Sequence, residues 1–167
     1  IVYTTNTGST KRYAQLPGNE TGLPVYALGE AEKTLSPGEK ILYLGWLNAG
    51  AVQGYRAAGR YQIEAVCAVG MGRTGTQEAL VRQKTGIPEE TPLFTLQGNF
   101  DGKKLRGLYR LMMAVMVKTA GKALSKKENR TEDEDDMLDM MLRGGERVKP
   151  QNLSAVLSWY KTQEARA

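Results

Sequence analysis

The stretch Thr5-Asn6-Thr7-Gly8-Ser9-Thr10 decides how this chain folds. It follows the apolar strand start Ile1-Val2-Tyr3 and runs into a helix that the sequence predicts over residues 9–17. A loop between a strand and a helix offers the unpaired N–H groups of the helix N-terminus, and the hydroxyls add further donors. Gly8 lets the backbone bend closely around an anion. Because the loop contains no Lys or Arg, we expect it to hold a phosphate by neutral dipoles.

An ordinary capped turn is the simpler alternative for this loop, since Ser and Thr favour helix N-caps. Four hydroxyls in six residues exceed what one cap needs. The loop is not a Walker A motif, because no Gly-Lys-Ser/Thr sequence follows it. We therefore expect phosphate binding without nucleotide hydrolysis of that type.

The composition places the chain among globular proteins of one domain, with 167 residues, 41% hydrophobic residues and a net charge of +5. No apolar run approaches the roughly 20 residues of a membrane span. The absence of histidine excludes a Ser/His triad and a His-ligated metal, and we expect no metal and no catalytic nucleophile. The chain opens inside a strand without a signal peptide, and its single cysteine, Cys67, fits a reducing compartment, so we expect a cytoplasmic protein.

Short apolar runs alternate with helical stretches along the first hundred residues. Strands are predicted at 1–4, 23–28, 40–46, 63–69 and 92–97, and helices at 9–17, 50–60, 75–86 and 151–165. The third to fifth strands are nearly continuous apolar runs, as in parallel strands that are covered on both faces. The alternation predicts a doubly wound α/β sandwich with a parallel sheet, in which ligands bind at the carboxyl ends of the strands.

Residues 103–148 interrupt this alternation, and we interpret them as a helical insertion within a single domain spanning 1–167. Residues 103–127 combine helical apolar spacing with many Lys and Arg residues. Thr131-Glu132-Asp133-Glu134 is a capping box that predicts a helix start, and Arg143-Gly144-Gly145 predicts its end. The stripe that the first piece carries is interpreted as core or as the face of a partner helix; it comprises Leu105, Leu108, Met112, Val115 and Met116.

Two further strand ends carry loops suited to a flat ligand. Trp46-Leu47-Asn48-Ala49-Gly50 follows the third strand, and the indole of Trp46 could stack on a planar ring, or it could simply pack under the next helix. Gly70-Met71-Gly72-Arg73-Thr74 follows the fourth strand. With Gly75 it matches G-x-G-x-x-G, but it lacks the position and the distant acid of a dinucleotide fingerprint. We interpret it as a loop around the edge of a ring, with Arg73 facing a ring system that becomes negative.

The hexamer at residues 5–10 resembles the phosphate loop of the flavodoxins, which reads Ser/Thr-x-Thr-Gly-x-Ser/Thr. The resemblance covers residues 1 to about 100 and the final helix. It implies a flavodoxin-like doubly wound sandwich with helices on both faces of a five-stranded parallel sheet in the order 2-1-3-4-5. It also implies noncovalent FMN as the cofactor. Its binding residues would be Thr5, Asn6, Thr7, Gly8, Ser9, Thr10, Trp46, Leu47, Asn48, Ala49, Gly50, Gly70, Met71, Gly72, Arg73 and Thr74.

Electron transfer through FMN is the activity that this resemblance implies, with a redox partner protein or a quinone as partner. The segment Leu108-Tyr109-Arg110-Leu111-Met112-Met113 is loosely similar to the menaquinone-dependent protoporphyrinogen dehydrogenases. That similarity implies, as an alternative, a quinone-linked dehydrogenase that contacts the inner face of a membrane through residues 103–127.

A non-redox regulatory module that binds phosphate is the alternative from another class. The third strand ends in Leu44-Gly45-Trp46, without the aspartate that a phosphorylated response regulator would need. Nucleic-acid binding is disfavoured, because such proteins interleave aromatic residues with basic ones, and Tyr109 is the only aromatic residue among the cations of residues 103–127. The presence of a flavin absorbance band in the purified protein would separate the redox functions from the regulatory one.

Overall fold

The computed structural model describes residues 1–100 and 107–166. Its centre is a parallel sheet in the order β2-β1-β3-β5-β6, which is the predicted order of the five parallel strands counted along the chain. The strands are β1 (Val2–Tyr3), β2 (Tyr26–Ala27), β3 (Lys40–Asn48), β5 (Gln62–Gly70) and β6 (Leu93–Gln97). A short extra strand, β4 (Ala51–Val52), pairs antiparallel with the end of β3.

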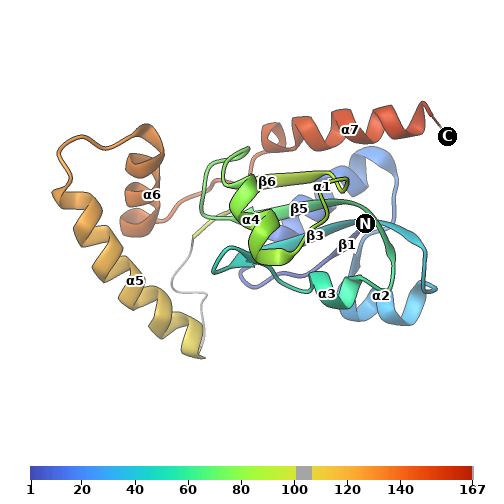
Figure 1. The fold of residues 1–167 in the computed structure, drawn as a ribbon, viewed down its shortest axis with the longest axis horizontal. Helices are drawn as coiled ribbons and strands as arrows, with labels where there is room; N and C mark the ends of the chain where they lie inside the picture. The colour runs from blue at the N-terminus through green and yellow to red at the C-terminus, as the bar shows by residue number, and fades with distance from the viewer. Residues whose placement is uncertain (101–106, 167) are drawn as a thin grey trace.

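Helices cover both faces of the sheet, as predicted for a doubly wound arrangement (Figure 1). On one face lie α1 (Ser9–Thr21) and α7 (Ser154–Glu164), the latter preceded by a 3₁₀ turn at Pro150–Leu153. On the other lie α2 (Leu28–Thr34), α3 (Tyr55–Ala58) and α4 (Glu78–Thr85).

Alternation along the central strands creates the two cores. In β3, Leu42 and Leu44 pack with α1 and α7, whereas Ile41 and Tyr43 pack toward α2, α3 and α4. Successive strand residues point to opposite faces, so a continuous apolar run fills both cores at once. Cys67 in β5 is fully buried, and its burial raises the pKa of the thiol well above its usual range. It is therefore a packing residue.

The predicted helix at residues 50–60 is wrong. Ala49 and Gly50 both have positive φ and form a tight turn that folds β4 back onto β3. Gly54, also at positive φ, ends this segment, and only the single turn of α3 remains helical. The predicted strand 23–28 is likewise reduced to two residues, and α2 begins directly after it. Helix α1 continues past Pro17 to Thr21.

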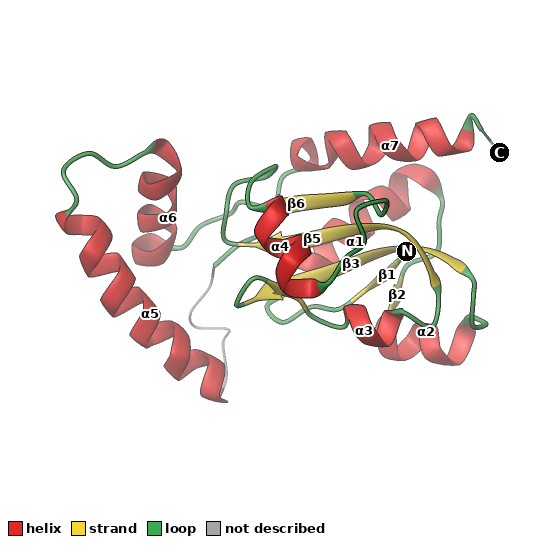
Figure 2. Ribbon diagram, viewed as in Figure 1, coloured by secondary structure: helices red, strands yellow, loops and turns green. Residues whose placement is uncertain are grey.

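The predicted helical insertion forms two helices, α5 (Gly107–Lys126) and α6 (Glu132–Arg143), which stand beyond the carboxyl ends of the strands (Figure 2). The capping box is confirmed, because the Thr131 hydroxyl accepts from the Glu134 N–H and the Glu134 carboxylate accepts from the Thr131 N–H. Residues 103–106, part of the predicted basic segment, lie outside the described residues. Within the described part of the chain, no helix is long and apolar enough to cross a membrane.

Candidate functional site

The three loops predicted from the sequence meet in one cleft of about 560 Å³ at the carboxyl end of the sheet, which we call the loop cleft. The loop after β1 contributes Asn6, Thr7, Ser9 and Thr10. All five residues of 46–50 line the cleft, and the loop after β5 contributes Gly70, Met71 and Gly72. Of the remaining predicted residues, Thr5, Gly8, Arg73 and Thr74 lie outside this lining.

Helix α1 begins without a side-chain cap, because its N-cap residue is Gly8 with φ 101°. The first intrahelical bond runs from the Arg12 N–H to the Gly8 carbonyl at 3.1 Å, which leaves the amides of Ser9, Thr10 and Lys11 without an intrahelical acceptor. The Thr5 hydroxyl accepts from the Gly8 N–H at 3.1 Å and so braces the loop. The hydroxyls of this loop therefore do not cap the helix, and its N-terminal amides remain available to an anion.

The loop after β3 is a β-hairpin rather than the start of a helix. Leu47 pairs with Val52 and Asn48 pairs with Ala51 across the Ala49–Gly50 turn. A further backbone hydrogen bond closes the hairpin, from the Gln53 N–H to the Trp46 carbonyl at 2.9 Å. Half-buried Trp46 and Leu47 both line the cleft. They give this part of its lining aromatic and apolar surface.

Arg73 does not lie in the cleft lining, contrary to the prediction that it faces the edge of a ring. Its guanidinium donates to Asp133 at 2.8 Å and to Glu132 at 3.4 Å, both in the first turn of α6. The hydrogen bond that Arg73 donates to Asp133 is the main cause that raises the pKa of Arg73. Thr74 is also engaged elsewhere, because its hydroxyl accepts from the Gln97 N–H at 3.1 Å. Lys84 of α4 is the one charged side chain among the described residues of the lining.

The wall opposite the loops is rich in methionine. Of the seven methionines in the sequence, all but the fully buried Met140 line the loop cleft. Met71 belongs to the loop after β5, and the methionine wall is formed by the other five, from α5 and α6: Met112, Met113, Met116, Met137 and Met141. Thioether side chains are flexible and polarisable, and they adapt to flat or irregular apolar surfaces. The interpretation of the α5 stripe as core is wrong for Met112 and Val115, which are exposed, whereas Met116 is half-buried. The signal for this wall in the sequence was its composition, because the chain has seven methionines and two phenylalanines.

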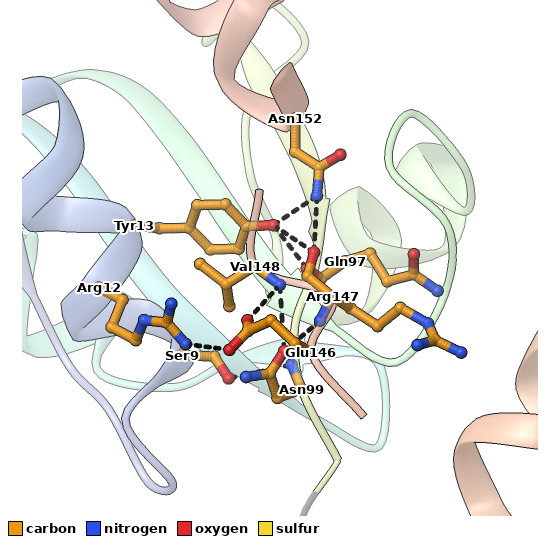
Figure 3. A network of polar contacts seen from close by, with 9 residues as sticks. All are labelled: Ser9, Arg12, Tyr13, Gln97, Asn99, Glu146, Arg147, Val148 and Asn152. Atoms are coloured by element: carbon orange, nitrogen blue, oxygen red, sulfur yellow. Dashed lines mark hydrogen bonds and ion pairs between the residues drawn. The ribbon is translucent and has the colours of Figure 1, made fainter. Parts of the chain in front are cut away.

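A polar network fixes the loop after β6 against the start of α1 (Figure 3). The Ser9 hydroxyl accepts from the Asn99 N–H at 3.0 Å. The side-chain Oδ1 of Asn99 accepts in turn from the backbone N–H groups of Arg147 and Val148, at 2.5 and 3.0 Å. Tyr13 donates to the Gln97 carbonyl at 2.6 Å, and its burial raises its pKa. The site is therefore held by residues on both sides of the insertion.

No cluster of His, Cys, Asp or Glu that could hold a metal exists among the described residues. The cleft combines neutral donors at one end with apolar and aromatic surface along its length. Such an arrangement suits an anionic group attached to a flat ring.

The chain matches no family model, no curated protein and no solved structure. Assignment of a function therefore depends on the geometry of the cleft.

Proposed function

We propose that the loop cleft binds FMN and that the protein is a flavodoxin-like electron carrier or FMN-dependent oxidoreductase. The observation that carries this proposal is the meeting of three loops, from three strands, around a helix N-terminus without a side-chain cap. The cleft volume falls within the roughly 300–1,000 Å³ of small-molecule sites. The phosphate end offers amides and hydroxyls, and the remaining length offers Trp46, Leu47 and the methionine wall.

When bound, FMN would supply one- or two-electron transfer through its ring. Thr7, Ser9, Thr10 and the amides of α1 would hold the phosphate by neutral dipoles. Trp46 or Leu47 would cover one face of the ring, and the Asn48–Gly50 turn would offer a backbone carbonyl to its edge. Lys84 takes the place that was predicted for Arg73, as the cation able to favour negative charge in the cleft.

Titration of the protein with FMN and with riboflavin tests this proposal, because riboflavin lacks the phosphate. We expect flavin fluorescence to be quenched on binding, with FMN bound more tightly. Thr7→Val should weaken FMN binding by about tenfold, the effect of one lost hydrogen bond to a charged group. It should leave riboflavin binding unchanged. Thr34→Val in α2 is the matched control, since its hydroxyl donates only to the Glu30 carbonyl. If neither flavin binds at micromolar concentrations, the proposal is wrong.

A membrane-surface oxidoreductase is the second candidate, and the outer side of α5 favours it. Leu111 and Val115 are 63% and 55% exposed, one turn apart, and several α5 cations lie nearby in sequence: Arg110, Lys118, Lys122 and Lys126. Apolar and cationic side chains together favour the surface of an anionic bilayer. Co-sedimentation with vesicles of phosphatidylglycerol, but not of phosphatidylcholine, would support this candidate. Leu111→Ser/Val115→Ser should abolish it, and Lys161→Gln on α7 should not.

A further inference from the structure

A second cleft, of about 1060 Å³, lies on the other side of the phosphate loop; we call it the basic cleft. It is bounded by the start of α1, by α5, and by the chain from the end of α6 to Glu146. The two clefts adjoin along a shared lining from the phosphate loop, the loop after β6 and helices α5 and α6: Thr7, Ser9, Asn99, Phe100, Met113 and Met141. A ligand could therefore extend from one into the other.

Charge distinguishes the basic cleft from the loop cleft. Five cations line it: Lys11, Arg12, Arg110, Lys118 and Arg143. The one acid among its described lining residues, Glu146, is bound by Arg12 at 2.5 Å (Figure 3). Arg143 pairs with Asp139 at 2.9 Å within α6. No carboxylate among the described residues pairs with Lys11, Arg110 or Lys118, so three positive charges are left without a counter-charge.

Apolar side chains form the rest of the basic cleft. Phe100 and Met113 stand beside Val117 and Leu142 in its lining. An inorganic ion would use the cations but not this surface. An organic anion with a ring or chain would use both, because apolar burial adds to the charge attraction.

We propose that the basic cleft binds a second anionic group, a phosphate or carboxylate carried on an apolar or ring-bearing molecule, beside the phosphate in the Thr5–Thr10 loop. This inference rests on the proposed flavin site. The group has two sources with the same chemistry. It is either the second phosphate and adenine of a flavin dinucleotide, which continue directly from the first phosphate, or an anionic substrate that binds separately.

Binding measurements with FMN, FAD and ADP on one set of variants test the proposal. Arg110→Ala/Lys118→Ala removes two of the unmatched cations. Lys122→Ala/Lys126→Ala is the matched control, because it removes two cations of the same helix that do not line the cleft. A dinucleotide source predicts that FAD binds more tightly than FMN. The first variant should then reduce FAD affinity at least tenfold and leave FMN affinity within about twofold.

If the source is a separate substrate, FMN and FAD should bind with equal affinity. ADP should then bind to the FMN-loaded protein, and this ADP binding should be lost in Arg110→Ala/Lys118→Ala but not in the control variant. Unchanged binding of FAD and ADP in that variant, relative to its control, would overturn the proposal. Loss of all flavin binding would overturn the proposed function instead. ADP binding to the unloaded protein, still sensitive to Arg110 and Lys118, would then support the basic cleft alone.

Discussion

Gly54 shows how a single residue holds the hairpin of the site. The preceding carbonyl, of Gln53, accepts hydrogen bonds from Thr4 and Tyr43 at 2.8 and 2.7 Å. Burial raises the pKa of Tyr43 to about 12, so it remains a donor at every physiological pH. A Cβ on Gly54 would stand 2.2 Å from the Tyr43 hydroxyl and 2.6 Å from Thr4 Cγ2. The close approach of β1, β3 and the hairpin therefore requires glycine here.

Gly54→Ala should lower the free energy of unfolding by about 2–4 kcal/mol, the sum of left-handed strain and overpacking. Gly38→Ala is the matched control, because Gly38 has φ +83° but nothing within 4 Å of an added Cβ. It should cost only about 1 kcal/mol. Urea unfolding measures both variants. Equal losses would mean that the contacts with Tyr43 and Thr4 do not constrain this loop.

The location of the strand-end residues was predictable from the sequence, but the partners of charged residues were not. Thr7 follows β1, whereas Trp46 and Gly70 lie in the last residues of β3 and β5, and all three line the cleft. Arg73 lies in the loop after β5, the strand that ends at Gly70, yet it pairs with acids about 60 positions away in the sequence. A local pattern reports which edge of the sheet a residue occupies. It does not report which distant element reaches that residue.

At the scale of elements, the buried central strands and the capped helix α6 were predictable, whereas α2 and the hairpin were not. The runs at 40–46 and 63–69 specify strands because burial on both faces leaves no alternative for so apolar a segment. Residues 50–60 have helical spacing, but the turn at Ala49–Gly50 and the contacts of Gly54 override it. Tertiary contacts outweigh the small differences in intrinsic propensity of a short segment.

Ion pairs connect helix α6 to two loops beside the sheet, and they lead to a prediction. Arg147, 20% exposed, bridges Asp136 and Asp139 at 3.2 and 3.0 Å, whereas Arg73, 48% exposed, binds the first turn of α6. Arg147→Gln should lower the free energy of opening of α6 by about 1–3 kcal/mol. Arg73→Gln should have a smaller effect, because exposed ion pairs contribute little.

Amide hydrogen exchange measures this opening. At low salt, the amides of α6 should exchange faster in Arg147→Gln than in the wild type. Arg143→Gln serves as the control, since its bond to Asp139 lies within the helix and ties it to nothing else. Added salt should speed exchange in the wild type and have less effect in Arg147→Gln. If Arg143→Gln speeds exchange as much as Arg147→Gln, the tie is not between α6 and the sheet.

For the whole molecule, acid should loosen the attachment of the insertion before it unfolds the sheet. The hydrogen bond from Arg12 is the main cause that lowers the pKa of Glu146. Such a group stabilises the fold above its unfolded value of about 4.3, and the contribution is lost as pH falls through the lower folded value. Glu146→Gln should therefore reduce the acid-side slope of stability, by no more than about 1 kcal/mol in total.

Urea unfolding between about pH 3 and 7 measures that slope. The exposed Glu128, in the turn between α5 and α6, provides the control as Glu128→Gln. Its slope should match that of the wild type. A slope that changes equally in both variants would remove any special role for the Arg12–Glu146 pair.

The insertion should be removable without loss of the fold. Among the side chains that the structure describes, none from α5 or α6 belongs to either core cluster, although Val148 and Leu153, which follow these helices, belong to one. Its two ends lie together, because Asn99 accepts from the Arg147 N–H and an added Cβ on Gly144 would be 3.0 Å from the Phe100 carbonyl oxygen. A linker of about two glycines in place of residues 101–143 would be long enough to join Phe100 to Gly144.

The shortened chain should unfold cooperatively in urea, since its two cores and the Asn99 network are unchanged. Its m-value should fall only in proportion to the surface removed. FMN affinity should drop through loss of the methionine wall, while the preference for FMN over riboflavin persists, because the phosphate loop and α1 remain. Binding of the dye ANS with loss of cooperativity would contradict this and make the insertion part of the folding unit. A lost preference for FMN would instead place the phosphate contacts on the α5–α6 side of the cleft.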